Sequence, residues 1–77
     1  MKITIENTEK IVELNGVPAR IWEGETDSGI KVRCFITRVI IDITDKTNEQ
    51  IEQYKRELLQ VRPPSVEVEA YPLKLIL

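Results

Sequence analysis

The Asn15-Gly16 pair, set between two runs rich in β-branched residues, constrains this chain more than any other feature. Both central residues of a type I′ turn need positive φ, which asparagine and glycine tolerate, so the pair predicts a tight β-hairpin. Pairing across this turn places Leu14 opposite Val17 and Val12 opposite Ala19.

A second hairpin is predicted directly after the first. The turn over Thr26-Asp27-Ser28-Gly29, with glycine suited to a left-handed position, places Ile21 near Cys34 and Ala19 near Ile36. The second arm alternates strictly, with the apolar set Ile30, Val32, Cys34 and Ile36 against Lys31, Arg33, Phe35 and Thr37. This period of two is typical of a strand with one buried face. One continuous apolar face across three strands is therefore expected.

Further strands are predicted on both sides of the hairpins. The four expected before the helix are Lys2–Glu6, Lys10–Leu14, Val17–Glu25 and Gly29–Ile43, with Asn7-Thr8 as the first turn. Proline has no N–H to donate, so Pro18 must sit where the ladder needs none. In the last run the apolar residues change from even to odd numbers, which predicts a bulge at Thr37-Arg38.

The second half of the chain predicts one helix and one more strand. Thr47-Asn48-Glu49-Gln50 matches a capping box, and the helix that follows ends before Pro63-Pro64. Its apolar stripe consists of Ile51, Tyr54, Leu58 and Val61. Val66–Ala70 alternates as a strand does. Beyond it the chain is unusually apolar, and Leu73, Leu75 and Leu77 are predicted to form either a paired strand or an interface, including a homo-oligomer seam.

These elements predict an α+β fold in a single domain over residues 1–77. The expected order is β-β-β-β-α-β, with an antiparallel sheet of four to six strands and one helix packed on its apolar face. The formal net charge of −2 disfavours a general nucleic-acid binder. No apolar run is long enough to span a bilayer and the first residues do not resemble a signal peptide, so a soluble cytoplasmic protein is expected.

The residue types needed for most catalysis are missing. The chain has no histidine, no P-loop and no GxGxxG motif. Cys34 is the only cysteine, so it can form no internal disulfide or zinc site, and it is expected to be a buried, inert thiol. We expect neither an enzyme nor a metal or cofactor site. Pairs of Asp and Glu could still act in general acid–base catalysis, but such catalysis needs a cleft that a chain this small hardly provides.

One surface cluster has the composition of a binding site. The predicted pairing brings Trp22 near Arg33 and Arg20 near Phe35, on the face opposite the apolar one. Tryptophan and arginine are enriched at binding hot spots, and aromatic rings can receive guanidinium groups by cation–π contact. Cross-strand packing that shields the outer face of the sheet also accounts for these four residues, and this is the favoured interpretation.

The strands of the first half resemble those of a family of very small proteins encoded by bacteriophages and prophages. The residues that carry this resemblance are Lys2–Glu6, Ile11–Gly24, Thr26–Ile30 and Cys34–Arg38. No active site comes with the resemblance. It implies a non-enzymatic phage accessory protein in the bacterial cytoplasm that binds and inhibits a host defence protein. Two alternatives stay open: an oligomeric sponge that sequesters a small anionic, nucleotide-like ligand between subunits, and a structural or virion-associated protein.

Overall fold

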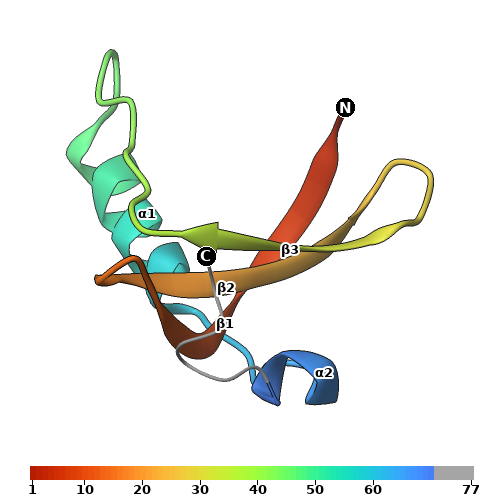
Figure 1. The fold of residues 1–77 in the computed structure, drawn as a ribbon. Helices are drawn as coiled ribbons and strands as arrows, with labels where there is room; N and C mark the ends of the chain where they lie inside the picture. The colour runs from red at the N-terminus through yellow and green to blue at the C-terminus, as the bar shows by residue number, and fades with distance from the viewer. Residues whose placement is uncertain (71–77) are drawn as a thin grey trace.

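The computed structural model describes residues 1–70 and shows an α+β fold built on a three-stranded antiparallel sheet (Figure 1). The α+β class and the antiparallel sheet with a helix are confirmed. The described residues contain three strands and two helices, rather than the four or more strands and one helix of the prediction. In chain order the elements are β1 (Ile3–Leu14), β2 (Val17–Thr26), β3 (Lys31–Ile36), α1 (Asn48–Leu59) and α2 (Val66–Glu69).

The first hairpin has the predicted turn and register. Asn15 and Gly16 have φ of 50° and 83°, the positive values that a type I′ turn requires. Leu14 pairs with Val17, and Val12 pairs with Ala19.

The strand before this turn is continuous, so the predicted break at Asn7-Thr8 is wrong. β1 instead contains an irregularity between Asn7 and Ile11, where the register against β2 shifts. The Thr8 hydroxyl donates a 2.7 Å hydrogen bond to the Ile21 carbonyl, and the Glu9 amide donates to the Arg62 carbonyl at 2.9 Å. Because these bonds satisfy the polar groups of the irregular segment, the strand bends without ending.

The second hairpin differs from the prediction by one residue. The Thr26 amide donates to the Ile30 carbonyl and the Gly29 amide to the Thr26 carbonyl, both at 2.9 Å. Three residues, 27–29, therefore form the loop, and Gly29 takes the left-handed position with a φ of 86°. The register is consequently Ile21 opposite Phe35, not near Cys34.

β3 ends at Ile36, so the predicted strand to Ile43 with a bulge at Thr37-Arg38 is wrong. Continuing the register would bring Arg38 opposite Pro18. Val17 pairs with Leu14 across the tight turn, so the nitrogen of the next residue, Pro18, points toward the β3 side. This nitrogen carries no hydrogen to donate, and the ladder stops before it.

α1 begins where the capping box predicts. The Gln50 amide donates to the Thr47 hydroxyl at 3.2 Å, and the Thr47 amide donates to the Gln50 side chain at 2.9 Å. The helix ends at Leu59, ahead of Pro63-Pro64. Neither α1 nor α2 has the length and apolarity needed to cross a membrane.

The predicted strand over Val66–Ala70 is wrong, because residues Val66–Glu69 form the short helix α2. The Ser65 hydroxyl accepts a hydrogen bond from the Val68 amide and caps this turn. Val68 is completely buried beside Val12 and Ile21. The tertiary contact of this one valine outweighs the strand preference of the alternating segment.

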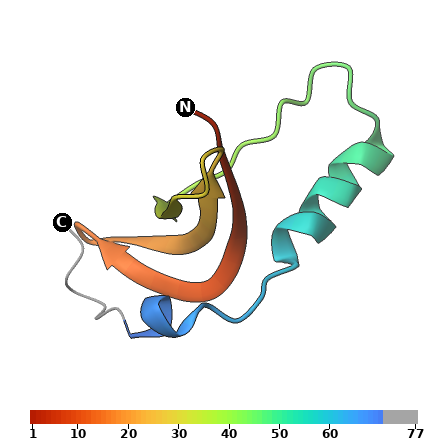
Figure 2. The same cartoon turned by 90° about the vertical axis from the view of Figure 1, so that its right-hand side faces the viewer.

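The sheet presents two different faces. The first, here called the α2 face, carries Val12, Ile21 and Phe35, which pack with Val68 of α2. The second, the Trp22 face, carries residues that the register places side by side on the three strands: Ile5, Asn7, Arg20, Trp22, Val32, Cys34 and Ile36. Figure 2 shows α2 close against the bent sheet while α1 projects away from it. Cys34 is half-buried on the Trp22 face and is not in the core.

The backbone of β1 lies close against Gly24 of β2, and we predict that Gly24→Ala destabilises the fold. A Cβ at this position would collide with the Thr4 carbonyl oxygen and with the Ile5 backbone. Since both neighbours are main-chain atoms that cannot rotate away, the variant should lose about 2 kcal/mol or more of unfolding free energy, measured by urea denaturation.

The matched control is Gly29→Asn. A Cβ at Gly29 would meet only the Glu25 carboxylate, at the ordinary contact distance of 4.0 Å, and asparagine tolerates the positive φ, so this variant should lose less than about 1 kcal/mol. Equal losses in the two variants would contradict the close approach at Gly24.

Candidate functional site

An apolar hollow lies between the Trp22 face of the sheet and α1. Its volume is about 470 Å³. The apolar side chains that line it are Ile5, Trp22, Val39, Tyr54, Leu58 and Val61. Charged and amide side chains surround them, namely Glu6, Asn7, Glu57, Gln60 and Arg62. An apolar floor with a polar rim is the usual anatomy of a surface that binds another molecule.

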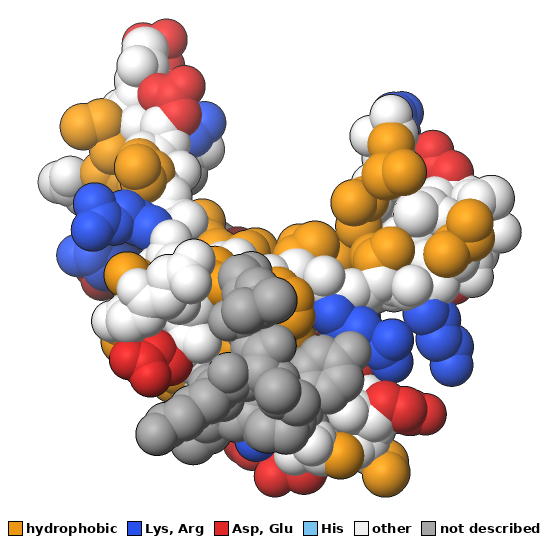
Figure 3. All heavy atoms as spheres, in the orientation of Figure 1, with side chains coloured by type: hydrophobic (Ala, Val, Ile, Leu, Met, Phe, Trp, Pro, Cys, Tyr) orange, Lys and Arg blue, Asp and Glu red, His pale blue; other side chains and the backbone are white. Residues whose placement is uncertain are grey.

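A second hollow of about 240 Å³ adjoins the first. The two share Trp22, Val39 and Leu58, so these three residues form the common wall. The second hollow adds Arg20, Ile36, Thr37, Arg38 and Leu59. We call the two hollows together the apolar groove. In Figure 3 the same side of the molecule shows a wide notch, with hydrophobic side chains along its floor and on both walls.

Two hydrogen bonds set the position of α1 over the groove. The Asn7 side-chain amide donates to the Leu58 carbonyl at 2.9 Å, and the Tyr54 hydroxyl donates to the Val39 carbonyl at 3.0 Å. Asn7 is buried and its strand partner is Trp22, so the helix end is tied directly beside the tryptophan. The residues of α1 nevertheless remain accessible, and none is buried. Among residues 1–70, therefore, α1 flanks the groove without closing it.

The predicted cluster of Arg20, Trp22, Arg33 and Phe35 is divided between the two faces. Trp22 lies opposite Cys34, and Arg20 lies opposite Ile36. Arg33 and Phe35 belong to the α2 face, because their partners are Glu23 and Ile21. The three-residue loop after Thr26 moves β3 by one residue relative to the predicted register, and a shift of one residue exchanges the two faces of a strand. The pairing that united the four residues is therefore wrong, whereas a binding role for each of them stays a prediction.

Trp22 and Arg20 remain together in the apolar groove, next to residues that the prediction did not include. Tyr54 and Leu58 could have been found from the helical stripe, which marks the face that α1 turns toward the sheet. The predicted interface residues Leu73, Leu75 and Leu77 lie outside the described residues.

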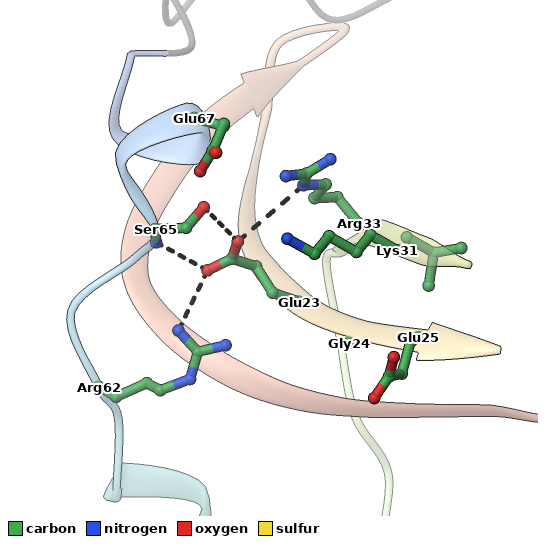
Figure 4. A pocket seen from close by; sticks show the side chains of 9 residues that line it. Glu23, Gly24, Glu25, Lys31, Arg33, Arg62, Ser65 and Glu67 are labelled. Carbon is green, nitrogen blue, oxygen red and sulfur yellow. Dashed lines mark hydrogen bonds and ion pairs between the residues drawn. The ribbon is translucent and has the colours of Figure 1, made fainter. Parts of the chain in front are cut away.

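A buried carboxylate on the α2 face is the main polar feature that the sequence analysis missed. Both oxygens of Glu23 are held: Oε1 accepts from the Ser65 hydroxyl at 2.6 Å, and Oε2 accepts from the Ser65 amide at 2.9 Å and from Arg62 at 3.1 Å (Figure 4). Arg33 adds an ion pair at 3.9 Å. A charged residue in phase with buried Ala19 and Ile21 is the sequence signal that marks this position.

These contacts change the pKa of Glu23. Burial raises the pKa of this carboxyl, but hydrogen bonds from the Ser65 hydroxyl and amide, together with Arg62, lower it by more, so the net pKa lies below 4.5. A carboxylate stabilised in this way is a weak base at neutral pH and is poorly suited to activating the Ser65 hydroxyl. Its physical role is to fasten the segment before α2 to the sheet.

Comparison of the chain with protein-family models, curated proteins and solved structures found no match. Within residues 1–70, no group of three or more histidine, cysteine, aspartate or glutamate side chains is placed to hold a metal ion. The case for a function therefore rests on the geometry of the groove and the cluster around Glu23.

We predict that Glu23→Gln removes about 2–3 kcal/mol of unfolding free energy at pH 7, because it breaks hydrogen bonds to a charged, buried group. The folded-state pKa of Glu23 lies below the unfolded value near 4.5, so the unfolded chain binds more protons between the two values. The stabilisation is present above pH 4.5 and is lost as the pH falls through the folded-state pKa.

Urea denaturation of both proteins between pH 7 and pH 3 measures this effect. The wild-type stability should fall more steeply below pH 4.5 than that of Glu23→Gln. The control is Glu13→Gln, an exposed carboxylate on β1, which should follow the wild type. Parallel curves for the wild type and Glu23→Gln would show that this carboxylate does not hold the segment in place.

Proposed function

We propose that this is a non-enzymatic binding protein that acts by holding another protein in its apolar groove. The observation that carries the proposal is the open apolar surface around Trp22, Val39 and Leu58, which α1 flanks without closing. Leu59, at the helix end of the groove, is 80% exposed. An apolar surface shared by a sheet and a helix, with charged side chains beside it, is typical of a protein interface.

The side chains in the groove also fit a contact with a protein. Trp22 and Tyr54 supply large, rigid contact areas, and both are residue types that dominate binding energy at interfaces. Arg20 and Arg38 lie at the edge, where they can orient a partner by charge. The largest contribution to binding is expected from the burial of Trp22 and its apolar neighbours.

The partner we propose is a host protein, and the consequence is its inhibition. The resemblance of the N-terminal half to small phage and prophage proteins supports this part of the proposal, because accessory proteins of that kind commonly act by occluding a host factor. The site of action would be the bacterial cytoplasm. The functional surface is the apolar groove, in place of the four-residue cluster expected from the sequence.

We predict that a photo-crosslinking residue at position 59 captures a partner in bacterial cells and that the same residue at position 66 does not. Leu59 and Val66 are equally accessible, at 80% and 83%, but only Leu59 lines the groove. Recovery of the cross-linked partner, identified by mass spectrometry, should differ at least about tenfold between the two positions.

The variants Leu59→Glu and Val66→Glu provide the second half of the test. Capture by a crosslinker at position 40, on the exposed Ile40, should be lost with Leu59→Glu and retained with Val66→Glu. Circular dichroism confirms that both variants stay folded. Equal capture from positions 59 and 66 would show that the groove is not the binding surface.

A further inference from the structure

The described part of the chain buries little apolar surface for its size. Its buried hydrophobic residues are Val12, Ala19, Ile21 and Val68. α1 contributes none, although a helix of 12 residues is marginal in water unless an apolar face is covered. Domains this small usually need an additional source of stability, such as disulfides, a metal or self-association. Cys34 is the only cysteine, so an internal disulfide is excluded.

The two uncovered surfaces are complementary to each other. The Trp22 face is an apolar sheet surface, and α1 carries an apolar stripe; a helix on a sheet is the common way to bury both. Within one molecule the Asn7 side chain of β1 bonds to the Leu58 carbonyl near the C-terminal end of α1, and Tyr54 bonds to Val39 beyond the end of β3, while the helix projects away from the sheet (Figure 2). A second molecule carries the same pair of surfaces and can cover both.

The charges at the two ends of the groove point to the same partner. The first hollow is lined by Glu6, Glu57 and Arg62, and because Glu6 and Arg62 form an ion pair at 3.3 Å, its net negative charge comes from Glu57; the second hollow is lined by Arg20 and Arg38. In a two-fold contact, when one residue of the first copy contacts a different residue of the second copy, the reverse contact is formed as well. An antiparallel arrangement therefore brings the acidic end of one groove toward the basic end of the other, twice in each dimer.

We propose that a second copy of this chain fills the apolar groove, in a two-fold homodimer in which each α1 lies over the Trp22 face of the other. This inference rests on the proposed function, since it takes the groove to be a protein-binding surface. It adds that the groove is closed by self-association when no other protein is present. A host protein then enters the groove by replacing the second copy.

Sedimentation equilibrium of the wild type, Leu59→Glu and Val66→Glu tests the inference over a hundredfold range of concentration. The wild type and Val66→Glu should reach twice the 8.9 kDa chain mass, whereas Leu59→Glu should weaken the dimer at least about tenfold. Leu59 is 80% exposed in the single chain, so its replacement leaves the monomer fold intact, and circular dichroism checks this.

A pair of charge reversals tests the arrangement. Arg38→Glu and Glu57→Arg should each form weaker homodimers than the wild type, because each places like charges at both ends of the contact. An equal mixture of the two should form a heterodimer several-fold tighter than either homodimer, since it restores opposite charges at both ends. A mixture no tighter than its components would overturn the two-fold arrangement.

The remaining outcomes separate this inference from the proposed function. A wild type that stays monomeric while position 59 captures a host protein overturns the homodimer and leaves the proposed function standing. The wild type could also be monomeric while Leu59→Glu lowers the unfolding free energy more than Val66→Glu does. That result would show that another part of the same chain occupies the groove, and it also overturns the homodimer. A dimer that Leu59→Glu leaves unchanged places the contact elsewhere and overturns it as well.

Discussion

The three-residue loop between β2 and β3 is the constraint on which the rest of the structure depends. Its hydrogen bonds from Thr26 to Ile30 and from Gly29 to Thr26 set the register of β3, and a register decides which side chains share a face. With this loop, Ile21 meets Phe35 on one face and Trp22 meets Cys34 on the other. A loop longer by one residue would exchange the faces of β3 and give a different protein surface.

Alternate residues of β2 consequently have two different roles, one in the buried core and one in the apolar groove. Ala19, Ile21 and Glu23 point to the α2 face, where they are all buried and where Glu23 holds the chain at Arg62 and Ser65. Arg20 and Trp22 point to the other face and line the apolar groove. Among the described residues, the buried contacts that stabilise the fold are concentrated on the α2 face, and the opposite side of the sheet carries the apolar groove.

The position of α1 shows how folding and binding are linked in this chain. Asn7 bonds to the C-terminal end of the helix and Tyr54, in its middle, bonds to Val39, yet no residue of the helix is buried. A partner in the groove would complete the apolar burial that the single chain lacks, so that part of the binding energy would become folding energy. The apolar side chains of the groove are thus left uncovered by the described part of the chain and also form a binding surface. This explains why so small a chain can carry an extensive interface.

Local residue chemistry determined the first hairpin and the start of α1, because the Asn15-Gly16 turn and the Thr47–Gln50 capping box are each satisfied by atoms a few residues apart. Three features depended on partners far along the chain. β1 remains one strand because residue 62 bonds to its irregular segment, β3 stops because Pro18 offers no donor, and Val66–Glu69 is helical because Val68 fills the space over Val12 and Ile21. The apolar stripe of α1 and the presence of Trp22 could be predicted from the sequence. Only the tertiary structure brings them together in one groove, because this needs the β2–β3 register and the hydrogen bonds that position α1.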